Sequence, residues 1–239
     1  RLATDPRAGK VASNDLAHAL ATNATAGTTV SATLAAITAS QSTIQSPKSK
    51  IHCFATGGIG GVHRNWNTTP DISADLRALA SNQVCVVCAG AKSVLDVPAT
   101  LEALHMLGVP VVGWRTNVFP QFHSRGDDRL TIAQHADDAA TIAQICRTHW
   151  RDLQQTTAVL LANPVLPQFA LDLNEVNAAA LRAEETAPAQ HATGAARTPF
   201  LLAEMPPPTA TRVLYANIAL LPANARLPAE VAVSMAHGQ

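Results

Sequence analysis

Short continuous apolar runs alternate along this chain with longer stretches in which apolar residues recur every three or four positions. The clearest run is Val84–Ala89, in which every residue is apolar. A parallel strand that helices cover on both faces has this composition. Similar runs of strand length occur at Ile51–Ala55, Val109–Gly113 and Ala158–Leu161. The pattern therefore predicts a largely parallel sheet built from these segments.

The stretches between the runs predict helices, because apolar side chains three and four positions apart share one helix face. In chain order we expect helices at residues 14–22, 31–39, 73–80, 97–107, 132–148, 172–185, 214–221 and 227–236. Alternating strands and helices are typical of βαβ units. The expected fold class is α/β: an α/β/α layered single domain over residues 1–239 with a largely parallel central sheet.

Polar or proline-rich segments separate these elements. Residues 3–10 are polar and predict irregular structure, and residues 40–50, rich in Ser, Gln, Pro and Lys, predict a surface loop. Residues 186–198 contain few bulky apolar side chains. The consecutive prolines Pro206–Pro208 predict a rigid break before the last helices.

The charge balance excludes some classes of partner. Lysines and arginines number 17, as do aspartates and glutamates, so the formal net charge is zero. A nucleic-acid or anionic-membrane surface calls for a basic patch, and this composition does not indicate one. No apolar run approaches the roughly 20 residues of a membrane-spanning helix. We expect a small-molecule ligand, with no nucleic acid and no membrane.

The four cysteines lie in or beside apolar segments, which favours a reducing compartment, most simply the cytoplasm. Cys85 and Cys88 have CxxC spacing, but they fall within a strand-like run, and no second pair completes a metal site. We therefore interpret them as core residues.

The stretch Phe54–Arg64 concentrates candidate chemistry. Five of the 12 glycines of the chain fall between Gly57 and Gly90, where the backbone must turn sharply or approach a ligand closely. Backbone N–H groups in such a loop suit a phosphate, as does a guanidinium beside it. The candidates for this contact are Thr56, Gly57, Gly58, His63 and Arg64. For the last two, an equal alternative is that they pin the loop through hydrogen bonds.

Lys92 follows a strand end and Gly90 in apolar surroundings. Loss of hydration there lowers the pKa of a lysine and makes its amine nucleophilic. The alternative is a solvated lysine on the next helix. Asp71, Ser73 and Asp75 stand around a predicted helix start, where they suit an anion site or simple helix capping.

The motifs FATGGIGGVHR, DISADL, CAGAKS, GVPVVGW, NVFPQF, ANPVLP, TPFLL and ANIAL follow one another along the chain. In sequence and order they resemble the pseudouridine-5′-phosphate glycosidase family, also called indigoidine-synthase-A-like. The resemblance implies an enzyme that reversibly cleaves the C–C glycosidic bond of pseudouridine 5′-phosphate, giving uracil and ribose 5-phosphate through a lysine Schiff base. Alternatives are a relative that attaches ribose 5-phosphate to another aromatic acceptor, and a catalytically inactive phosphosugar-binding chain.

The resemblance also implies roles for individual residues. Lys92 corresponds to the lysine that forms the Schiff base with C1′, and Asp71 to the aspartate that holds a divalent cation, usually Mn²⁺, largely through waters. Substrate contacts fall on Lys10, Val30, Ser73, Ala74, Asp75 and Asn217. Family members are trimers, so a homotrimer is expected.

Two segments depart from the family pattern. Lys10–Asp15 reads KVASND and lacks two arginines of the family's KVSRRD. Thr209–Leu214 reads TATRVL where the family has two glycines and a serine. The family's proton donor is a glutamate in a segment before Lys10, and we expect this chain to lack that segment.

Overall fold

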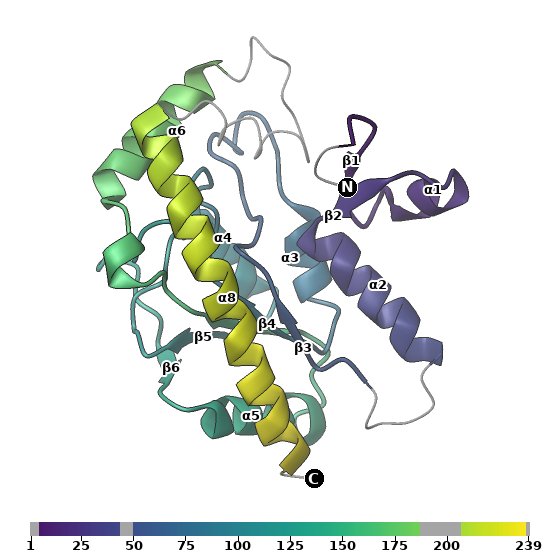
Figure 1. Cartoon of the computed structure of the whole chain (residues 1–239). Helices are drawn as coiled ribbons and strands as arrows, with labels where there is room; N and C mark the ends of the chain where they lie inside the picture. Colours follow the sequence, from purple (N-terminus) through teal and green to yellow (C-terminus); the bar gives the residue numbers. More distant parts are fainter. Residues whose placement is uncertain (1–4, 44–49, 187–206, 238–239) are drawn as a thin grey trace.

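A five-stranded parallel sheet forms the centre of the fold (Figure 1). The structure is a computed structural model that describes residues 5–43, 50–186 and 207–237. The strand order is β3 (Cys53–Ala55), β4 (Cys85–Cys88), β7 (Val159–Ala162), β5 (Val111–Trp114) and β6 (Gln134–Ala136). All neighbouring strands run parallel. The predicted α/β class with a parallel sheet is confirmed.

Helices cover both faces of this sheet, because successive strand residues point to opposite sides. Val86 and Cys88 of β4 pack in one apolar cluster, while Cys85 and Val87 pack in another. The first cluster includes side chains of α2 (Val30–Thr43), α3 (Ala74–Leu79) and α4 (Val97–Met106), and the second those of α5 (Ala139–Arg147) and α8 (Pro207–His237). Cys85 and Cys88 therefore face different layers and cannot act as one thiol pair.

The N-terminal elements and α6 lie outside the strands of the central sheet. Strands β1 (Gly9–Val11) and β2 (Ala26–Thr28) form a separate two-stranded parallel sheet, with α1 (Leu16–Ala21) between them. Helix α6 (Leu173–Thr186) lies beside the upper part of α8 (Figure 1). No helix within these described ranges is both long and apolar enough to cross a bilayer.

Side-chain caps explain where α3, α4 and α5 begin. Ser73 accepts a hydrogen bond from the backbone N–H of Asp75 at the start of α3. Asp96 and Asp138 do the same for α4 and α5, accepting from Ala99 and Thr141 respectively. Each cap satisfies a donor that a helix start otherwise leaves unpaired.

The single helix predicted over 132–148 is wrong in its first part. Residues Gln134–Ala136 form β6, which pairs with β5, and α5 begins only at Ala139. The Asp138 side chain provides the new start by capping α5. A π-helical turn, Thr148–Asp152, then extends past the predicted end. Pairing at the sheet edge outweighs the local helical pattern at 134–136.

The predicted interruption of the C-terminal helices is also wrong, since α8 is one helix of 31 residues with Pro222 and Pro228 inside it. A proline in a helix interior costs about 3 kcal/mol. The helix stays continuous because its buried side chains recur every three or four residues and pack against the rest of the protein: Val213, Ala216, Leu220, Asn224, Leu227, Val231 and Met235. Pro207 and Pro208 stand in the first turn, where proline is tolerated.

Two smaller predictions also change. Residues 9 and 10 of the segment expected to be irregular belong to the strand β1, and residues 40–43 of the expected loop continue α2. Residues 44–49 and 187–198 lie outside the described ranges.

Candidate functional site

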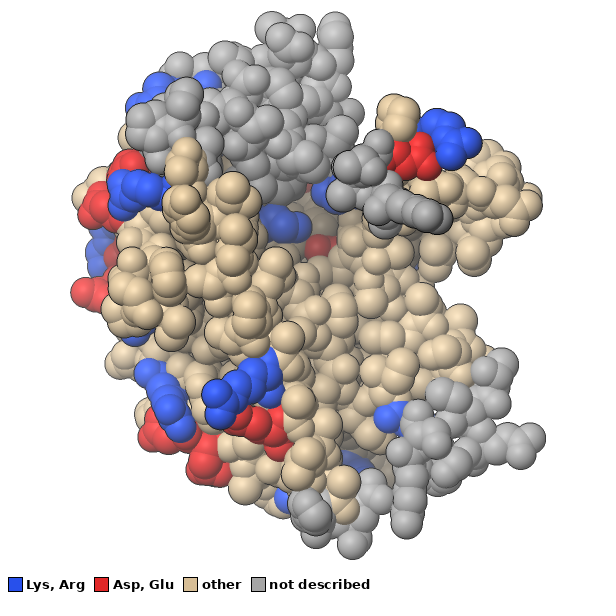
Figure 2. Space-filling view, in the orientation of Figure 1, with Lys and Arg blue, Asp and Glu red and all other residues tan. Residues whose placement is uncertain are grey.

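A cavity of about 640 Å³ lies where the loops that follow β3 and β4 meet the N-terminal elements. Figure 2 shows a hollow beside the N-terminal elements, with basic and acidic atoms at its floor. The cavity is lined by Lys10, Ala12, Ser13, Asn14, Asp15, Thr29, Ser31, Ala35, Gly60, His63, Asp71, Ile72, Ser73, Ala74, Asp75, Arg77 and Lys92. Open parallel sheets bind ligands beyond the carboxyl ends of their strands, and this cavity has that position.

The loops after β3 and β4 lie side by side because their backbones continue to pair. The backbone N–H of Ile59 donates to the carbonyl of Gly90 at 3.0 Å, and that of Lys92 donates to the carbonyl of Ile59 at 3.1 Å. Gly90 has a φ of +82°, and a Cβ there would collide with the carbonyl of Pro120. Only glycine fits this turn without strain. The pairing carries Lys92 to the cavity.

Asp75 connects the elements around the cavity. Its carboxylate accepts hydrogen bonds of 2.8 Å from the backbone N–H groups of Ser31 and Gly60, and the residue is only 2% exposed. Two charge-assisted bonds compensate for burial of the carboxylate. They also join the start of α2, the glycine-rich loop and the first turn of α3, so that Asp75 fixes the geometry of three walls.

Lys92 is half-buried. Burial lowers the pKa of its ammonium group, while the negative charge of Asp75 acts in the opposite direction. Lys10 is exposed as a residue, but partial burial of its ammonium group and the positive charge of Lys92 lower its pKa as well. A lowered pKa gives a larger neutral fraction near neutral pH, which an amine needs in order to attack a carbonyl carbon.

The structure brings seven of the predicted site residues into this one cavity: Lys10, His63, Asp71, Ser73, Ala74, Asp75 and Lys92. They come from positions far apart in the sequence. His63 is buried, and its backbone N–H donates to the carbonyl of Asp71 at 3.0 Å, which holds the two loops together.

The other predicted residues do not line the cavity as the structure has it. Val30 begins α2 and packs in the core. Gly57 and Gly58 lie against the ring of Phe122, and the carbonyl of Thr56 accepts a hydrogen bond of 2.8 Å from Asn224.

Arg64 and Asn217 are also elsewhere. The guanidinium of Arg64 donates to Asn177 at 3.1 Å and to the carbonyl of Ser93, and Arg64 lines a separate cavity of about 500 Å³. This arrangement favours the pinning role for Arg64. Asn217 of α8 bonds His123, on the loop that covers the glycine-rich turn.

Arg77 is a cavity residue that the sequence did not single out. It stands four positions after Ser73, and positions i and i+4 share a helix face. Within the described ranges its guanidinium has no ion-pair or hydrogen-bond partner. The helical spacing from the serine is the signal that could have found it.

The donor set suits a weakly held cation more than a fully coordinated one. Among the described residues no group of three or more His, Cys, Asp or Glu side chains could hold a metal ion. Asp71 lines the cavity, while the Asp75 carboxylate is already bonded by two backbone amides. One carboxylate with room for water fits a hydrated hard cation such as Mg²⁺ or Mn²⁺.

A comparison with known protein families assigns the chain to one of them. The model of the family "Indigoidine synthase A like protein" matches residues 1–234. The chain belongs to this family. The predicted resemblance is thereby confirmed.

Curated members of the family are similar along most of the chain. A pseudouridine-5′-phosphate glycosidase of Myxococcus xanthus is 46% identical over 227 residues, which are 95% of this chain and 71% of that protein. The enzyme of the same name from Caldanaerobacter subterraneus subsp. tengcongensis is 42% identical over 226 residues, covering 95% of this chain and 70% of that protein.

Two solved structures have a fold similar to that of this chain. The prealnumycin C-glycosynthase AlnA, determined in complex with ribulose 5-phosphate, is 33% identical with a TM-score of 0.83 and covers 99% of this chain and 74% of its own. An indigoidine synthase A-like protein from Thermotoga maritima is 32% identical with a TM-score of 0.82, covering 95% of this chain and 71% of its own.

Proposed function

We propose that this chain cleaves the C–C glycosidic bond of pseudouridine 5′-phosphate, reversibly, to give uracil and ribose 5-phosphate. The observation that carries the proposal is Lys92, a half-buried amine with a lowered pKa in a cavity at the carboxyl ends of β3 and β4. The names of the similar enzymes support the substrate. Cleavage of the C1′–C5 bond leaves the bonding electrons on uracil and C1′ short of electrons, and the nitrogen lone pair of a lysine amine compensates by forming an iminium at C1′.

The covalent step starts from the neutral amine of Lys92. Its nitrogen bonds to C1′ as the C1′–O4′ bond breaks, and O4′ takes up a proton while the nitrogen loses one. The nitrogen lone pair then forms C1′=N⁺, and the electron pair of the C1′–C5 bond stays on C5 of uracil, which is protonated. Water adds to the iminium carbon and releases the amine and ribose 5-phosphate. One water is consumed overall.

The charged groups around Lys92 have complementary roles in this proposal. Asp75 lies close enough to raise the pKa of Lys92 against the effect of burial, so it stabilises the iminium, which carries the same positive charge. Lys10 and Arg77 bind the phosphate in this proposal, since both line the cavity and carry positive charge. Asp71 would hold a divalent cation, Mn²⁺ by family resemblance, which when bound supplies positive charge and ordered water to the sugar phosphate.

A second candidate is the attachment of ribose 5-phosphate to an aromatic acceptor other than uracil. The similarity to AlnA, a C-glycosynthase, favours it. Both candidates use the same imine and differ in the carbon nucleophile that the site admits.

The test is chromatographic detection of uracil after incubation of the purified protein with pseudouridine 5′-phosphate and Mn²⁺. We expect uracil release by the wild type and none by Lys92→Ala. In the reverse direction, ribose 5-phosphate is offered with uracil or with another aromatic acceptor. Product with the aromatic acceptor alone would select the second candidate, and no product in either direction would leave a catalytically inactive sugar-phosphate binder.

We also propose that the protein is a homotrimer. Helix α8 exposes apolar side chains at helical spacing on one face, Leu214, Ile218 and Leu221, each more than half exposed, and an apolar stripe of this kind suits a subunit interface. Light scattering coupled to size exclusion should give three times the monomer mass of 25.0 kDa; a monomer would contradict this. The four free thiols suit the cytoplasm, which we propose as the location.

A further inference from the structure

Ser31 is a buried serine in the wall of the Lys92 cavity that the proposed reaction does not use. It is 0% exposed and lies in the first turn of α2. Its backbone N–H donates to Oδ1 of Asp75 at 2.8 Å. Its Oγ accepts a hydrogen bond of 3.1 Å from the backbone N–H of Ser13 and lies 2.9 Å from Oγ1 of Thr29. Ser31 therefore bonds both the carboxylate that acts on Lys92 and the segment that follows β1.

The surroundings decide which way the hydroxyl proton of Ser31 points. If Thr29 donated to Ser31, the proton of the fully buried Ser31 would have no acceptor among the described residues, and a buried donor without a partner is costly. Thr29 is only half-buried, so its own proton can reach the cavity or water. Ser31 Oγ therefore accepts from Ser13 and donates to Thr29, and a methyl group in its place would lose both bonds.

Lys10 belongs to the segment that Ser31 holds. It lies in β1, whose residues 9–11 lead directly into the bond that Ser13 makes to Ser31. One further bond joins β1 to the start of α2, since the backbone N–H of Thr29 donates to the carbonyl of Val11 at 2.9 Å. The position of the Lys10 backbone relative to α2 thus depends on two bonds, of which Ser31 makes one.

The other end of the same connection reaches Lys92. The negative charge of Asp75, which Ser31 helps to hold, raises the pKa of Lys92 against the effect of burial. Lys10 is close enough for the same groups to act on it: after burial, the positive charge of Lys92 lowers the pKa of Lys10, and Asp75 raises it. Lys10 and Lys92 both line the cavity. Ser31 therefore stands between the elements that carry the two lysines.

We propose that Ser31 is a positioning residue that fixes the separation between Lys10 and Lys92, so that a sugar phosphate bound by its phosphate at Lys10 presents its carbonyl carbon to Lys92. The inference rests on the proposed function, because it takes Lys10 as a phosphate contact and Lys92 as the nucleophile. Small errors in such a separation reduce the fraction of ligand that is held in a reactive position. The contribution of Ser31 is specific to phosphorylated sugars.

The first test compares two sugars in borohydride trapping of the imine. In Ser31→Ala the backbone N–H to Asp75 remains, so the chemistry at Lys92 is retained. We expect trapping of ribose 5-phosphate below saturation to slow about fivefold, the effect of one ordinary hydrogen bond, and trapping of ribose to stay within about twofold. Equal losses with both sugars would show a merely structural role, and no loss with ribose 5-phosphate would overturn the proposal.

Two further variants sharpen this comparison. Ser42→Ala is the matched control, because Ser42 is an exposed serine of the same helix whose hydroxyl donates to the carbonyl of Ala39 at 2.6 Å. It should leave both rates unchanged. Ser31→Cys fills the space of the serine with a weaker acceptor and should slow trapping of ribose 5-phosphate in the same direction as Ser31→Ala. Wild-type rates in Ser31→Cys together with a loss in Ser31→Ala would indicate a cavity effect and contradict the positioning role.

The second test is a double-mutant cycle with Lys10→Ala. Because Ser31 acts through Lys10, Ser31→Ala should have no further effect on the trapping of ribose 5-phosphate once Lys10 is removed. A fivefold loss in both backgrounds would overturn the proposal.

A third measurement does not depend on catalysis. Titration calorimetry of ribose 5-phosphate, in the Lys92→Ala background where no imine forms, should give a Kd about fivefold higher when Ser31→Ala is added. An unchanged Kd, or no binding in the Lys92→Ala background, would overturn the inference even in an enzyme that releases uracil. The expected change of Kd in a protein that releases no uracil would refute only the proposed function.

Discussion

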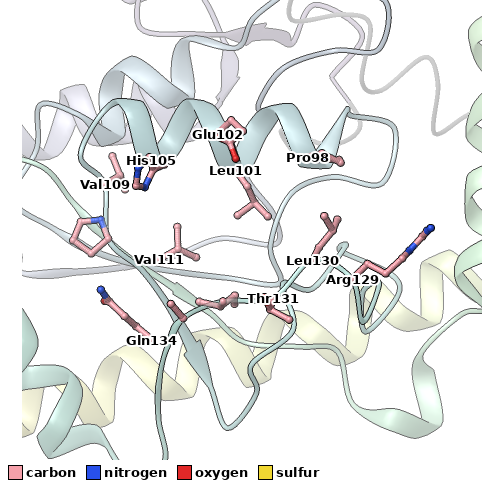
Figure 3. Close-up of a pocket in the computed structure, with 13 residues that line it drawn as sticks. Pro98, Leu101, Glu102, His105, Val109, Val111, Arg129, Leu130, Thr131 and Gln134 are labelled. Atoms are coloured by element: carbon pink, nitrogen blue, oxygen red, sulfur yellow. The ribbon is translucent and has the colours of Figure 1, made fainter.

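Two cavities lie at opposite ends of the parallel strands, and their difference shows what makes a site. The cavity that holds Lys92 lies beyond the carboxyl ends of β3 and β4, with basic and acidic side chains together and one carboxylate anchored by two backbone amides. The other, of about 440 Å³, lies beside α4 at the amino ends of β5 and β6. In Figure 3, Leu101, Val111 and Leu130 border the gap there.

In the second cavity, an ionisable side chain of the lining forms its ion pair with a residue outside the lining. Glu102, His105 and Arg129 line it, but Arg129 is paired with Asp127 on its own loop at 2.6 Å. Volume alone therefore does not indicate a site. What distinguishes the Lys92 cavity is a desolvated amine beside a carboxylate that two backbone amides hold in place.

The largest effect is expected for Lys92→Ala. Removal of the nucleophile should lower kcat at least about a thousandfold, measured as uracil release from pseudouridine 5′-phosphate. Lys50→Ala is the matched control, because Lys50 is exposed and lies outside the cavity. Substantial turnover by Lys92→Ala would show that Lys92 is not the nucleophile.

Asp75→Asn should lower kcat/KM about a hundredfold, since the iminium loses a neighbouring negative charge. It should also change the pH profile. The attacking form of Lys92 is the neutral amine, so the rate rises with pH up to the pKa of Lys92. Asp75 raises that pKa against burial, and its neutralisation should move the rise to lower pH. A shift to higher pH would contradict this assignment.

Asn224→Ala tests how α8 supports the cavity loops. The buried Asn224 amide donates to the carbonyl of Thr56 at 2.8 Å and accepts from Asn163 at 3.0 Å. Its loss leaves buried polar groups unpaired and should lower the free energy of unfolding by about 2 kcal/mol, measured from the urea midpoint. Asn174→Ala, at an exposed position, should leave the midpoint unchanged. Equal stability of both variants would show that the contact is dispensable.

Arg77→Gln should raise KM for the phosphorylated substrate about fivefold and leave kcat nearly unchanged, because the guanidinium contributes to binding of the phosphate in ground state and transition state alike. Arg226→Gln, on the exposed side of α8, is the control. If KM does not change, the phosphate lies at another part of the cavity.

The smallest effect is expected in the second cavity. The double variant Glu102→Gln and His105→Asn removes two of its ionisable groups, and kcat/KM should stay within about twofold of wild type, as for surface substitutions generally. A larger loss would show that the two ends of the sheet are coupled.

The sequence was a good guide where elements are long or strongly apolar. The run Val84–Ala89 forms β4, buried at every position of the strand. The three-residue strands β1, β2 and β6 were missed because so short a segment carries no periodicity. The continuity of α8 was missed because tertiary packing, which local rules do not include, compensates for Pro222 and Pro228.

The candidate site shows the same division. Lys92, Asp71, Ser73 and Asp75, which the structure brings into one cavity, were predicted from motifs. Arg77 was not, because a spacing of four from Ser73 is common on helix surfaces, and only the meeting of α3 with the loops after β3 and β4 places Arg77 at the cavity. Arg64 illustrates the converse: a motif residue whose guanidinium bonds Asn177, 113 positions away, outside the Lys92 cavity.

The central claim is that Lys92 forms an imine with the sugar phosphate. The most direct measurement is the intact mass of the protein after incubation with ribose 5-phosphate and sodium borohydride, for the wild type and Lys92→Ala. We expect one reduced sugar-phosphate adduct on the wild type and none on the variant. No adduct on the wild type, or the same adduct on both proteins, would contradict it.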